Sequence, residues 1–361
     1  MEICRITLTN FRVYRELELE LNPGLNFIQG DNGQGKTALL EAIYCLATSR
    51  SFRTSHESDL LHWGESMAWV RGELLTLDQR PRQLALSWQS RRGKLSKDLS
   101  RQGQKVERLA DFLGELPLAL FVPDDLSLVQ GGPAERRRYL DLILCKLYPS
   151  AVECLGRYQK VLASRNALLK RIPPPSSDEL SPWSQLLAPL GAELVERRGR
   201  MLDALGELVS QVHEELVGRA ESIQLVYRPH FGGSGSEFLS EIERRERDDL
   251  RRGSTQVGPH RDDFDLLVGG VDMRQFGSQG QCRTLALALR LAQARFFQAV
   301  TGESAVVLLD DCFSELDGGR QARLLRVLTG YAQVAVTSAT PIDVPVEASF
   351  YHVEGGRVAC R

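Results

Sequence analysis

The segment Gly30-Asp-Asn-Gly-Gln-Gly-Lys-Thr37 decides the fold of this chain. It matches the pattern GxxxxGK[ST] of a phosphate-binding P-loop, and it lies between a predicted strand, 25–29, and a predicted apolar helix, 36–47. In that context successive backbone N–H groups and the helix N-terminus surround a phosphate group. A tight strand-to-helix turn without a nucleotide is the alternative. The pattern predicts nucleotide contacts at Gly30, Asp31, Asn32, Gly33, Gln34, Gly35, Lys36 and Thr37.

A second part of the predicted site follows an apolar run, Ala305-Val-Val-Leu-Leu309, which ends in Asp310 and Asp311. A buried strand that ends in carboxylates is the form of a Walker B segment. Asp310 and Thr37 are then the predicted Mg²⁺ ligands, and Asp311 orients or deprotonates the attacking water. Asp311 and Lys36, which reaches the β- and γ-phosphates, are therefore the predicted catalytic residues. An ordinary strand-to-loop transition is the alternative, and the P-loop in the same chain argues against it.

A third segment precedes a long predicted helix, 279–300. Ser278 and the backbone amides that follow it can cap this helix and can also form an anion site at its start. Plain helix capping explains the same residues without a ligand.

The organisation of the chain is α/β at both ends and helical in the middle. Short predicted strands alternate with helices near the N-terminus and again after Gly253, whereas apolar residues recur at helical spacing in 133–171 and 184–217. We therefore expect a discontinuous α/β domain made of 1–125 and 253–361. A mainly helical lid or arm domain, 126–252, is inserted in it.

Composition and charge narrow the function classes. The first residues carry charges, and no apolar run approaches the roughly 18 residues that span a bilayer, so a cytoplasmic protein with no membrane partner is expected. The seven cysteines form neither a CxxC pair nor a disulfide cluster, so reduced thiols are expected. Because the net charge is −2, any DNA contact must rest on local basic patches. One candidate patch is Arg136, Arg137 and Arg138, which a solvated helix face explains equally well.

Six segments together resemble the RecF family of bacterial DNA-repair ATPases, which is of the ABC/SMC type. They lie at both ends of the chain in the family's order: 9–14, 30–44, 49–53, 256–263, 277–289 and 308–317. The resemblance implies an ABC-type P-loop ATPase head with an inserted helical domain, and ATP and Mg²⁺ as cofactors. It also implies signature residues that contact the γ-phosphate of a second subunit, and a D-loop in the same dimer interface. The signature residues are Ser278, Gln279, Gly280 and Gln281, and the D-loop residues are Ser314 and Asp317.

The resemblance further implies a recombination mediator that binds gapped DNA, or junctions of single- and double-stranded DNA, as an ATP-dependent homodimer. Such a protein helps to load RecA, together with RecO and RecR, in gap repair, replication restart and the SOS response. The chain departs from the general ABC pattern in two ways. It has Asp311 where a catalytic Glu is common, and the segment 336–340 offers hydroxyl groups where a switch histidine is common. We therefore expect weak, DNA-stimulated ATP hydrolysis that drives release.

Two other classes share parts of this pattern. The head of an SMC-like repair ATPase would need a much longer insertion with a sustained heptad repeat. The ATPase subunit of a membrane transporter would carry the usual Leu-Ser-Gly-Gly-Gln signature and a switch histidine, and both are absent from this sequence.

Overall fold

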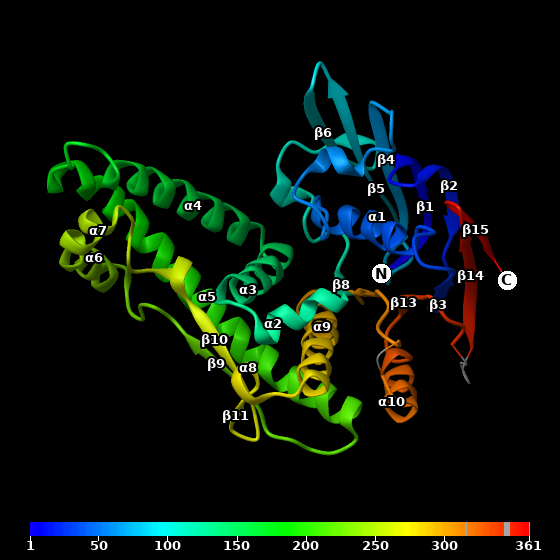
Figure 1. Cartoon of the computed structure of the whole chain (residues 1–361). Helices are drawn as coiled ribbons and strands as arrows, with labels where there is room; N and C mark the ends of the chain where they lie inside the picture. Colours follow the sequence, from blue (N-terminus) through cyan, green and yellow to red (C-terminus); the bar gives the residue numbers. More distant parts are fainter. Residues whose placement is uncertain (315, 343–346, 361) are drawn as a thin grey trace. The chain divides into compact units, whose positions relative to one another are not determined.

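The computed structural model describes residues 1–314, 316–342 and 347–360 (Figure 1). Contacts between residues divide the chain into two units. The first unit contains Met1–Asp125, Gln211–Ala220 and Arg283–Arg361, and the second contains Leu126–Ser210 and Glu221–Cys282. Helices α5 (Ser177–Val217) and α9 (Gln279–Thr301) each contribute residues to both units.

A mostly parallel sheet forms the part of the first unit that carries the P-loop. Its strand order is β15-β14-β3-β13-β12-β8, and β15 alone is antiparallel to its neighbour. The central strands are buried almost throughout, as expected where both faces of a parallel sheet are covered. The strand bounds are β3 Gly24–Gln29, β8 Leu118–Phe121, β12 Val306–Leu309, β13 Gln333–Ser338, β14 Ala348–Glu354 and β15 Arg357–Cys360.

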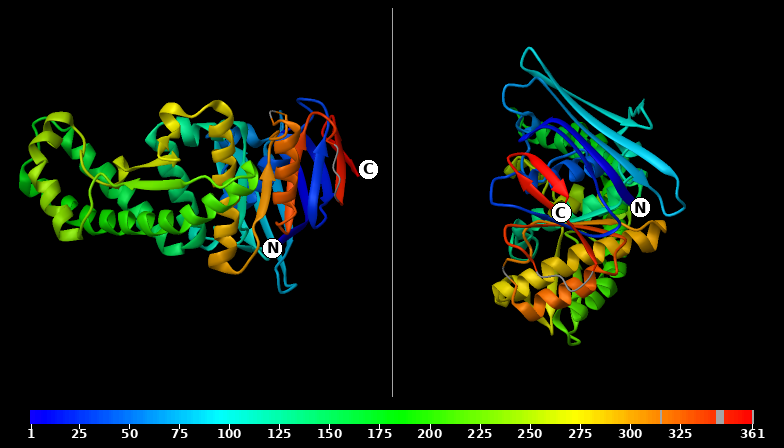
Figure 2. Two further views of the ribbon diagram at one scale, coloured as in Figure 1. Left: turned by 90° about the horizontal axis from the view of Figure 1, so that it is seen from below. Right: turned by 90° about the vertical axis from the view of Figure 1, so that its right-hand side faces the viewer.

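An antiparallel sheet of order β2-β1-β4-β5-β6-β7 completes this unit. Helix α1 (Lys36–Thr48) contacts both sheets and is buried along nearly its whole length, so one apolar core joins the two sheets through it. Helix α10 (Gly318–Leu328) connects β12 to β13. Both views in Figure 2 show the C-terminal strands beside the N-terminal ones, in agreement with the contact between β15 and β2. The strand bounds are β1 Glu2–Phe11, β2 Tyr14–Glu20, β4 Met67–Leu75, β5 Pro81–Arg91, β6 Lys94–Arg101 and β7 Gln104–Lys105.

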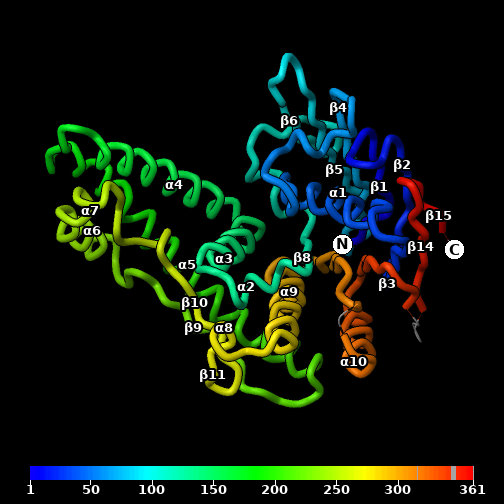
Figure 3. The backbone as a smooth tube through the Cα atoms, viewed as in Figure 1, coloured from blue at the N-terminus to red at the C-terminus, as the bar shows by residue number. Residues whose placement is uncertain are grey.

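The second unit is mainly helical and includes a three-stranded antiparallel sheet, β11-β10-β9 (Figure 3). Side chains of α4, α5 and α6 form its apolar core together with Val257. The bounds are α2 Leu126–Gln130, α3 Pro133–Leu147, α4 Pro149–Leu169, α6 Gly235–Arg244, α7 Glu246–Arg252, α8 Met273–Phe276, β9 Ile223–Arg228, β10 Asp263–Val268 and β11 Val271–Asp272.

The P-loop fold with a helical insertion agrees with the sequence-based expectation, but the second unit ends later than the predicted boundary at 252. It continues to Cys282, because β10 pairs along its whole length with β9 and therefore belongs to the small sheet. Residues Gln211–Ala220 also leave the second unit and join the first. Within the described residues, no helix is long and apolar enough to cross a membrane.

Candidate nucleotide-binding site

The P-loop connects β3 to α1 in a backbone conformation that requires glycine. Gly30 has a φ of 152°, and a Cβ atom at this position would lie 2.2 Å from the backbone oxygen of Val353 on β14. Gly35 has a φ of 121°, and a Cβ atom there would lie 2.9 Å from the hydroxyl oxygen of Tyr14. The loop therefore packs against β14 on one side and against the start of β2 on the other.

Lys36, at the first position of α1, turns its side chain back toward the loop. Its Nζ donates hydrogen bonds to the carbonyl oxygens of Gly30, at 2.6 Å, and Asp31, at 2.8 Å. Burial lowers the pKa of this ammonium group, while the nearby charges of Asp311 and Asp310 act in the opposite direction. The lysine is thus held among acceptors that a phosphate group can replace.

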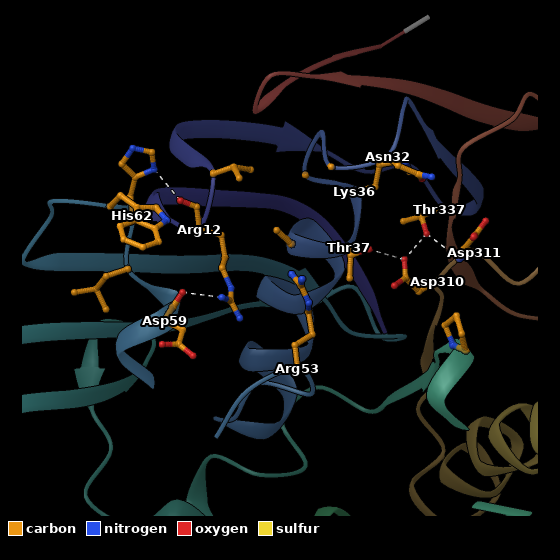
Figure 4. A pocket seen from close by; sticks show the side chains of 17 residues that line it. Arg12, Asn32, Lys36, Thr37, Arg53, Asp59, His62, Asp310, Asp311 and Thr337 are labelled. Atoms are coloured by element: carbon orange, nitrogen blue, oxygen red, sulfur yellow. Dashed lines mark hydrogen bonds between the residues drawn. The ribbon is translucent and has the colours of Figure 1, made fainter. Parts of the chain in front are cut away.

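Two hydroxyl groups meet on the first residue of the acidic pair (Figure 4). Oδ1 of Asp310 accepts a hydrogen bond from Thr37 Oγ1, at 3.1 Å, and one from Thr337 Oγ1, at 2.6 Å. Strand β13 lies between β3 and β12, so the carboxyl ends of these parallel strands bring the three residues together. Burial raises the pKa of Asp310, and the two hydrogen bonds lower it.

Asp311 continues the chain in a left-handed conformation, with a φ of 46°. Its backbone N–H donates to Thr337 Oγ1, at 3.0 Å. Its carboxylate oxygen Oδ1 is buried and has no hydrogen-bond partner among the described residues. A buried, unpaired carboxylate oxygen needs a partner, and carboxylate and hydroxyl oxygens are the ligands that Mg²⁺ prefers. The side chains therefore fit a Mg²⁺–nucleotide group.

These residues line a cavity of about 630 Å³ within the first unit. Five of the eight predicted P-loop residues lie on its wall: Asn32, Gly33, Gly35, Lys36 and Thr37. Asp310, Asp311 and Thr337 lie on the same wall. The remaining wall comes from residues that the predicted site did not include: Arg12, Val13, Ala38, Arg53, Asp59, Leu61, His62, Trp63 and Pro123 (Figure 4). Arg12 and Arg53 do belong to segments that carry the family resemblance, and this was the available signal.

One buried carboxylate organises the two arginines of that wall. Glu41 on α1 is fully buried and accepts hydrogen bonds from Arg12 Nε, at 2.8 Å, and Arg12 Nη2, at 2.6 Å. It also accepts a hydrogen bond from Ser51 Oγ, and one at 3.5 Å from Arg53. The cavity therefore presents three cationic side chains, those of Lys36, Arg12 and Arg53, as a phosphate-binding site requires.

Gln34, one of the predicted nucleotide contacts, bonds the β14–β15 hairpin. Its side-chain oxygen accepts a hydrogen bond from the N–H of Gly355, at 2.7 Å, and its backbone oxygen accepts one from Gly356, at 3.3 Å. Gly355 and Gly356 form the turn of the β14–β15 hairpin. The side chain of Gln34 therefore fastens the P-loop to this hairpin and does not line the cavity.

The predicted signature residues form a helix cap at the start of α9. Ser278 N–H donates to Gln281 Oε1, at 2.9 Å, and Gln281 N–H donates to Ser278 Oγ, at 3.3 Å, which is the reciprocal pair of a capping box. Phe276, just before them, is 72% exposed. In the predicted D-loop, Ser314 Oγ donates to the backbone oxygen of Asp311, at 3.1 Å, and Asp317 caps α10. Glu315, between them, lies outside the described residues.

The prediction that Arg136 contacts DNA is corrected by its environment in the second unit. Its guanidinium is buried, bonds both carboxylate oxygens of Asp263, at 2.6 and 3.0 Å, and donates to the backbone oxygen of Gly131, at 2.9 Å. Arg137 donates to the backbone oxygen of Asp262, at 2.8 Å, and burial lowers its pKa. Only Arg138 of the three is exposed to solvent.

A P-loop after one parallel strand, with an acidic pair after a strand two positions away, defines a P-loop ATPase head of the ABC/SMC class. The sequence model of the RecF/RecN/SMC N terminal domain family matches residues 2–354. The chain is 37% identical to the DNA replication and repair protein RecF of Bacillus cereus (strain B4264), and the match covers 100% of this chain and 99% of that protein. It is 36% identical, with the same coverage, to the protein of that name from Bacillus thuringiensis (strain Al Hakam). The chain therefore belongs to the RecF family.

Solved structures agree with this assignment. The recombination mediator protein RecF with ATP, described as part of the RecFOR pathway, superposes with a TM-score of 0.91 at 32% identity. The superposition covers 99% of this chain and 97% of the solved one. The Smc head bound to the C-winged helix domain of ScpA reaches a TM-score of 0.58 at 15% identity, with 100% and 97% covered, and shares the fold alone.

Proposed function

We propose that this protein is an ATP-binding recombination mediator of the RecF type. It binds gapped DNA, or junctions of single- and double-stranded DNA, as an ATP-induced dimer, and assists RecA loading together with RecO and RecR. The full-length similarity to proteins named RecF supports the biological role. The observation that carries the ATP-dependent chemistry is the convergence of Thr37 and Thr337 on Asp310 beside Lys36, in one cavity.

The residues of the cavity divide the work of binding the triphosphate. Lys36 exchanges the carbonyl oxygens of Gly30 and Asp31 for oxygens of the β- and γ-phosphates, and the P-loop N–H groups bind the phosphates from below. Arg12 and Arg53 supply further positive charge from another part of the cavity wall. Trp63, whose side chain is 94% exposed on this wall, offers a flat ring on which the base can stack.

Hydrolysis requires a bound metal and an oriented water. Mg²⁺, when bound by Thr37 and Asp310, neutralises charge on the phosphates. Asp311 then accepts a hydrogen bond or a proton from the attacking water through its unpaired Oδ1. An aspartate reaches less far than a glutamate, so we expect slow hydrolysis that DNA stimulates and that drives release of the DNA.

Dimerisation depends on the predicted signature and D-loop residues, which do not line the cavity. Ser278, Gln279, Gly280 and Gln281 form a helix start whose N–H groups can bind the γ-phosphate held by a second copy of the chain. Ser314 and Asp317 belong to the same interface. A nucleotide between two copies makes the dimer depend on ATP.

The test compares binding of gapped DNA by the wild-type protein and by Lys36→Met, at fixed moderate salt, without nucleotide, with ATP and with ADP. Light scattering follows the oligomeric state in the same samples. Lys160→Met, which removes an exposed lysine from α4, is the matched control. We expect ATP alone to induce the dimer and tight DNA binding, with both lost in Lys36→Met and kept in the control. DNA binding that ignores the nucleotide contradicts the proposal.

A further inference from the structure

Thr337 lies at the carboxyl end of β13, between the strand that leads to the P-loop and the strand that leads to the acidic pair. Its side chain is completely buried within the first unit, and it lines the cavity. Most hydrogen bonds of protein side chains go to backbone groups or water rather than to other side chains. The hydroxyl of Thr337 instead contacts both members of the acidic pair.

The two contacts use the hydroxyl group in both of its roles. It donates its hydrogen to Oδ1 of Asp310, at 2.6 Å, and it accepts the backbone N–H of Asp311, at 3.0 Å. The hydroxyl group of Thr337 has a single hydrogen, which points to the carboxylate of Asp310. The position of that carboxylate therefore determines how the lone pairs of the Thr337 oxygen are oriented toward the N–H of Asp311. One side chain therefore couples the side chain of the first acid to the backbone of the second.

The backbone of Asp311 needs such support. Its φ of 46° is a left-handed conformation that residues other than glycine seldom adopt; aspartate tolerates it better than most, and surrounding contacts help to maintain it. This conformation directs the side chain to the cavity wall, where Oδ1 is buried without a partner among the described residues. The charge of Asp311 also acts on Lys36 across the cavity. A change at the amide of Asp311 therefore moves a carboxylate that lines the cavity.

We propose that Thr337 is a positioning residue for hydrolysis, which holds Asp311 in its left-handed conformation and aligns it with Asp310 through one hydroxyl group. The hydrolytic part of this proposal rests on the proposed ATPase function. The structural part, that the hydroxyl maintains the backbone of Asp311, holds for the protein without nucleotide and can be tested separately.

The experiment compares the full-length wild-type chain with Thr337→Val, which keeps the shape and removes the hydroxyl, and Thr337→Ser, which keeps the hydroxyl. Thr337→Ala removes the same hydroxyl with a smaller side chain and serves as a second variant. Thr329→Val is the matched control at an exposed helix end. Three quantities are measured: kcat and KM for ATP, the Kd of a fluorescent ATP analogue in EDTA, and the exchange rate of the Asp311 amide hydrogen without nucleotide.

We expect Thr337→Val and Thr337→Ala to lower kcat at least tenfold, with KM and Kd within about threefold of the wild type, and to speed exchange of the Asp311 amide at least tenfold. Thr337→Ser and Thr329→Val should match the wild type in all three quantities. Unchanged turnover and exchange in Thr337→Val overturn the proposal, and so does a serine variant as impaired as the valine variant. If the wild type hydrolyses no ATP, the proposed ATPase fails, and the exchange rates still decide the role of Thr337 in the backbone of Asp311.

Discussion

At the scale of single residues, the cavity depends on charges that are held before any nucleotide arrives. Lys36 is held by two carbonyl oxygens, and Arg12 and Arg53 are held by Glu41. Such contacts reduce the conformational entropy that the side chains lose when a phosphate group binds. The buried Glu41 also offsets part of their positive charge, so the site keeps its cations close together without strong repulsion.

The substitution Glu41→Gln keeps the size of the side chain and removes its charge. Arg12 is only 18% exposed, so its guanidinium would lose its ionic partner in a partly buried position. We expect the free energy of unfolding to fall by about 2 kcal/mol, less than the 3–5 kcal/mol of a fully buried pair because Arg53 can turn to water. The Kd for ATP should rise about tenfold, since both arginines lose their fixed positions.

Urea denaturation and nucleotide titration measure these two effects. The control is Glu20→Gln, because Glu20 pairs with Arg5 at the surface and its side chain is 74% exposed. An exposed pair contributes about 0–1 kcal/mol, so this variant should bind ATP as the wild type does. If Glu41→Gln behaves like Glu20→Gln, Glu41 does not organise the cavity.

At the scale of secondary-structure elements, the P-loop is supported by the β14–β15 hairpin. Gln34 bonds Gly355 and Gly356 at the hairpin turn, and Gly30 packs directly on β14. The hairpin closes one edge of the parallel sheet, and its turn lies against the P-loop. The last strands of the chain thus stabilise a loop that is encoded more than 300 residues earlier.

The substitution Gln34→Ala tests this support. It leaves the N–H of Gly355 without its acceptor and should lower the free energy of unfolding by about 1 kcal/mol. Because the P-loop becomes less ordered, the Kd for ATP should rise about fivefold, as nucleotide titration can measure. Gln102→Ala is the control, since Gln102 also joins two strands at a hairpin of the same unit but does not line the cavity. Equal effects of both variants on ATP binding would show that Gln34 has no particular role.

A second element, the loop 258–262 in the second unit, contains a histidine with a strongly lowered pKa. His260 Nδ1 accepts a hydrogen bond from Tyr158, at 2.7 Å, and Nε2–H donates to the backbone oxygen of Thr255, at 3.0 Å. Burial is the main cause that lowers the pKa of His260 to about 4, with a smaller contribution from Arg261. Both partners fit the neutral ring, and a protonated ring would lose the acceptor role of Nδ1.

The direction of the resulting pH dependence follows from this difference. The unfolded chain binds a proton at the ordinary pKa of about 6.5, whereas the folded chain binds it only near 4. Stability is therefore unaffected by His260 above pH 7 and falls as the pH decreases from about 6.5 to 4, by about 3 kcal/mol in total. His260→Gln removes this contribution. Urea denaturation at pH 7.5 and pH 5 should show a smaller loss in the variant than in the wild type; equal losses would contradict a neutral, buried His260.

At the scale of the whole molecule, the sequence predicted the contiguous parts of the site and missed those that tertiary packing assembles. The spacing of the P-loop and the carboxylates after an apolar strand identify Lys36 and Asp310 directly. Arg12 reaches the cavity because the β1–β2 turn packs on Glu41. The local sequence around Arg12 does not predict that contact, since Glu41 lies on a different element. The end of the second unit was missed for the same reason, since the pairing of β9 with β10 joins segments separated by two helices.

The basic segment 136–138 shows how the same limit affects a proposed DNA contact. Three adjacent arginines read alike in the sequence, but the fold buries Arg136 against Asp263 and leaves Arg138 exposed. Since the net charge of the chain is −2, affinity for DNA must come from individual exposed cations rather than from the whole molecule. Arg136 and Arg138 therefore form a matched pair of substitutions with opposite expected effects.

We expect Arg138→Ala to weaken binding to gapped DNA about threefold to tenfold at moderate salt, and to reduce the slope of log K against log salt by about 1, as the loss of one phosphate contact predicts. Its stability should match the wild type. Arg136→Ala removes the nearer ionic partner of Asp263 and leaves it with Arg274, at 3.8 Å, so it should lower the free energy of unfolding by about 2 kcal/mol, less than the 3–5 kcal/mol of a fully uncompensated buried charge. Where it is folded, its salt slope should be unchanged. Fluorescence anisotropy at several salt concentrations and urea denaturation measure both quantities. A salt slope that changes in Arg136→Ala and not in Arg138→Ala would mean that the second unit exposes Arg136 when it binds DNA.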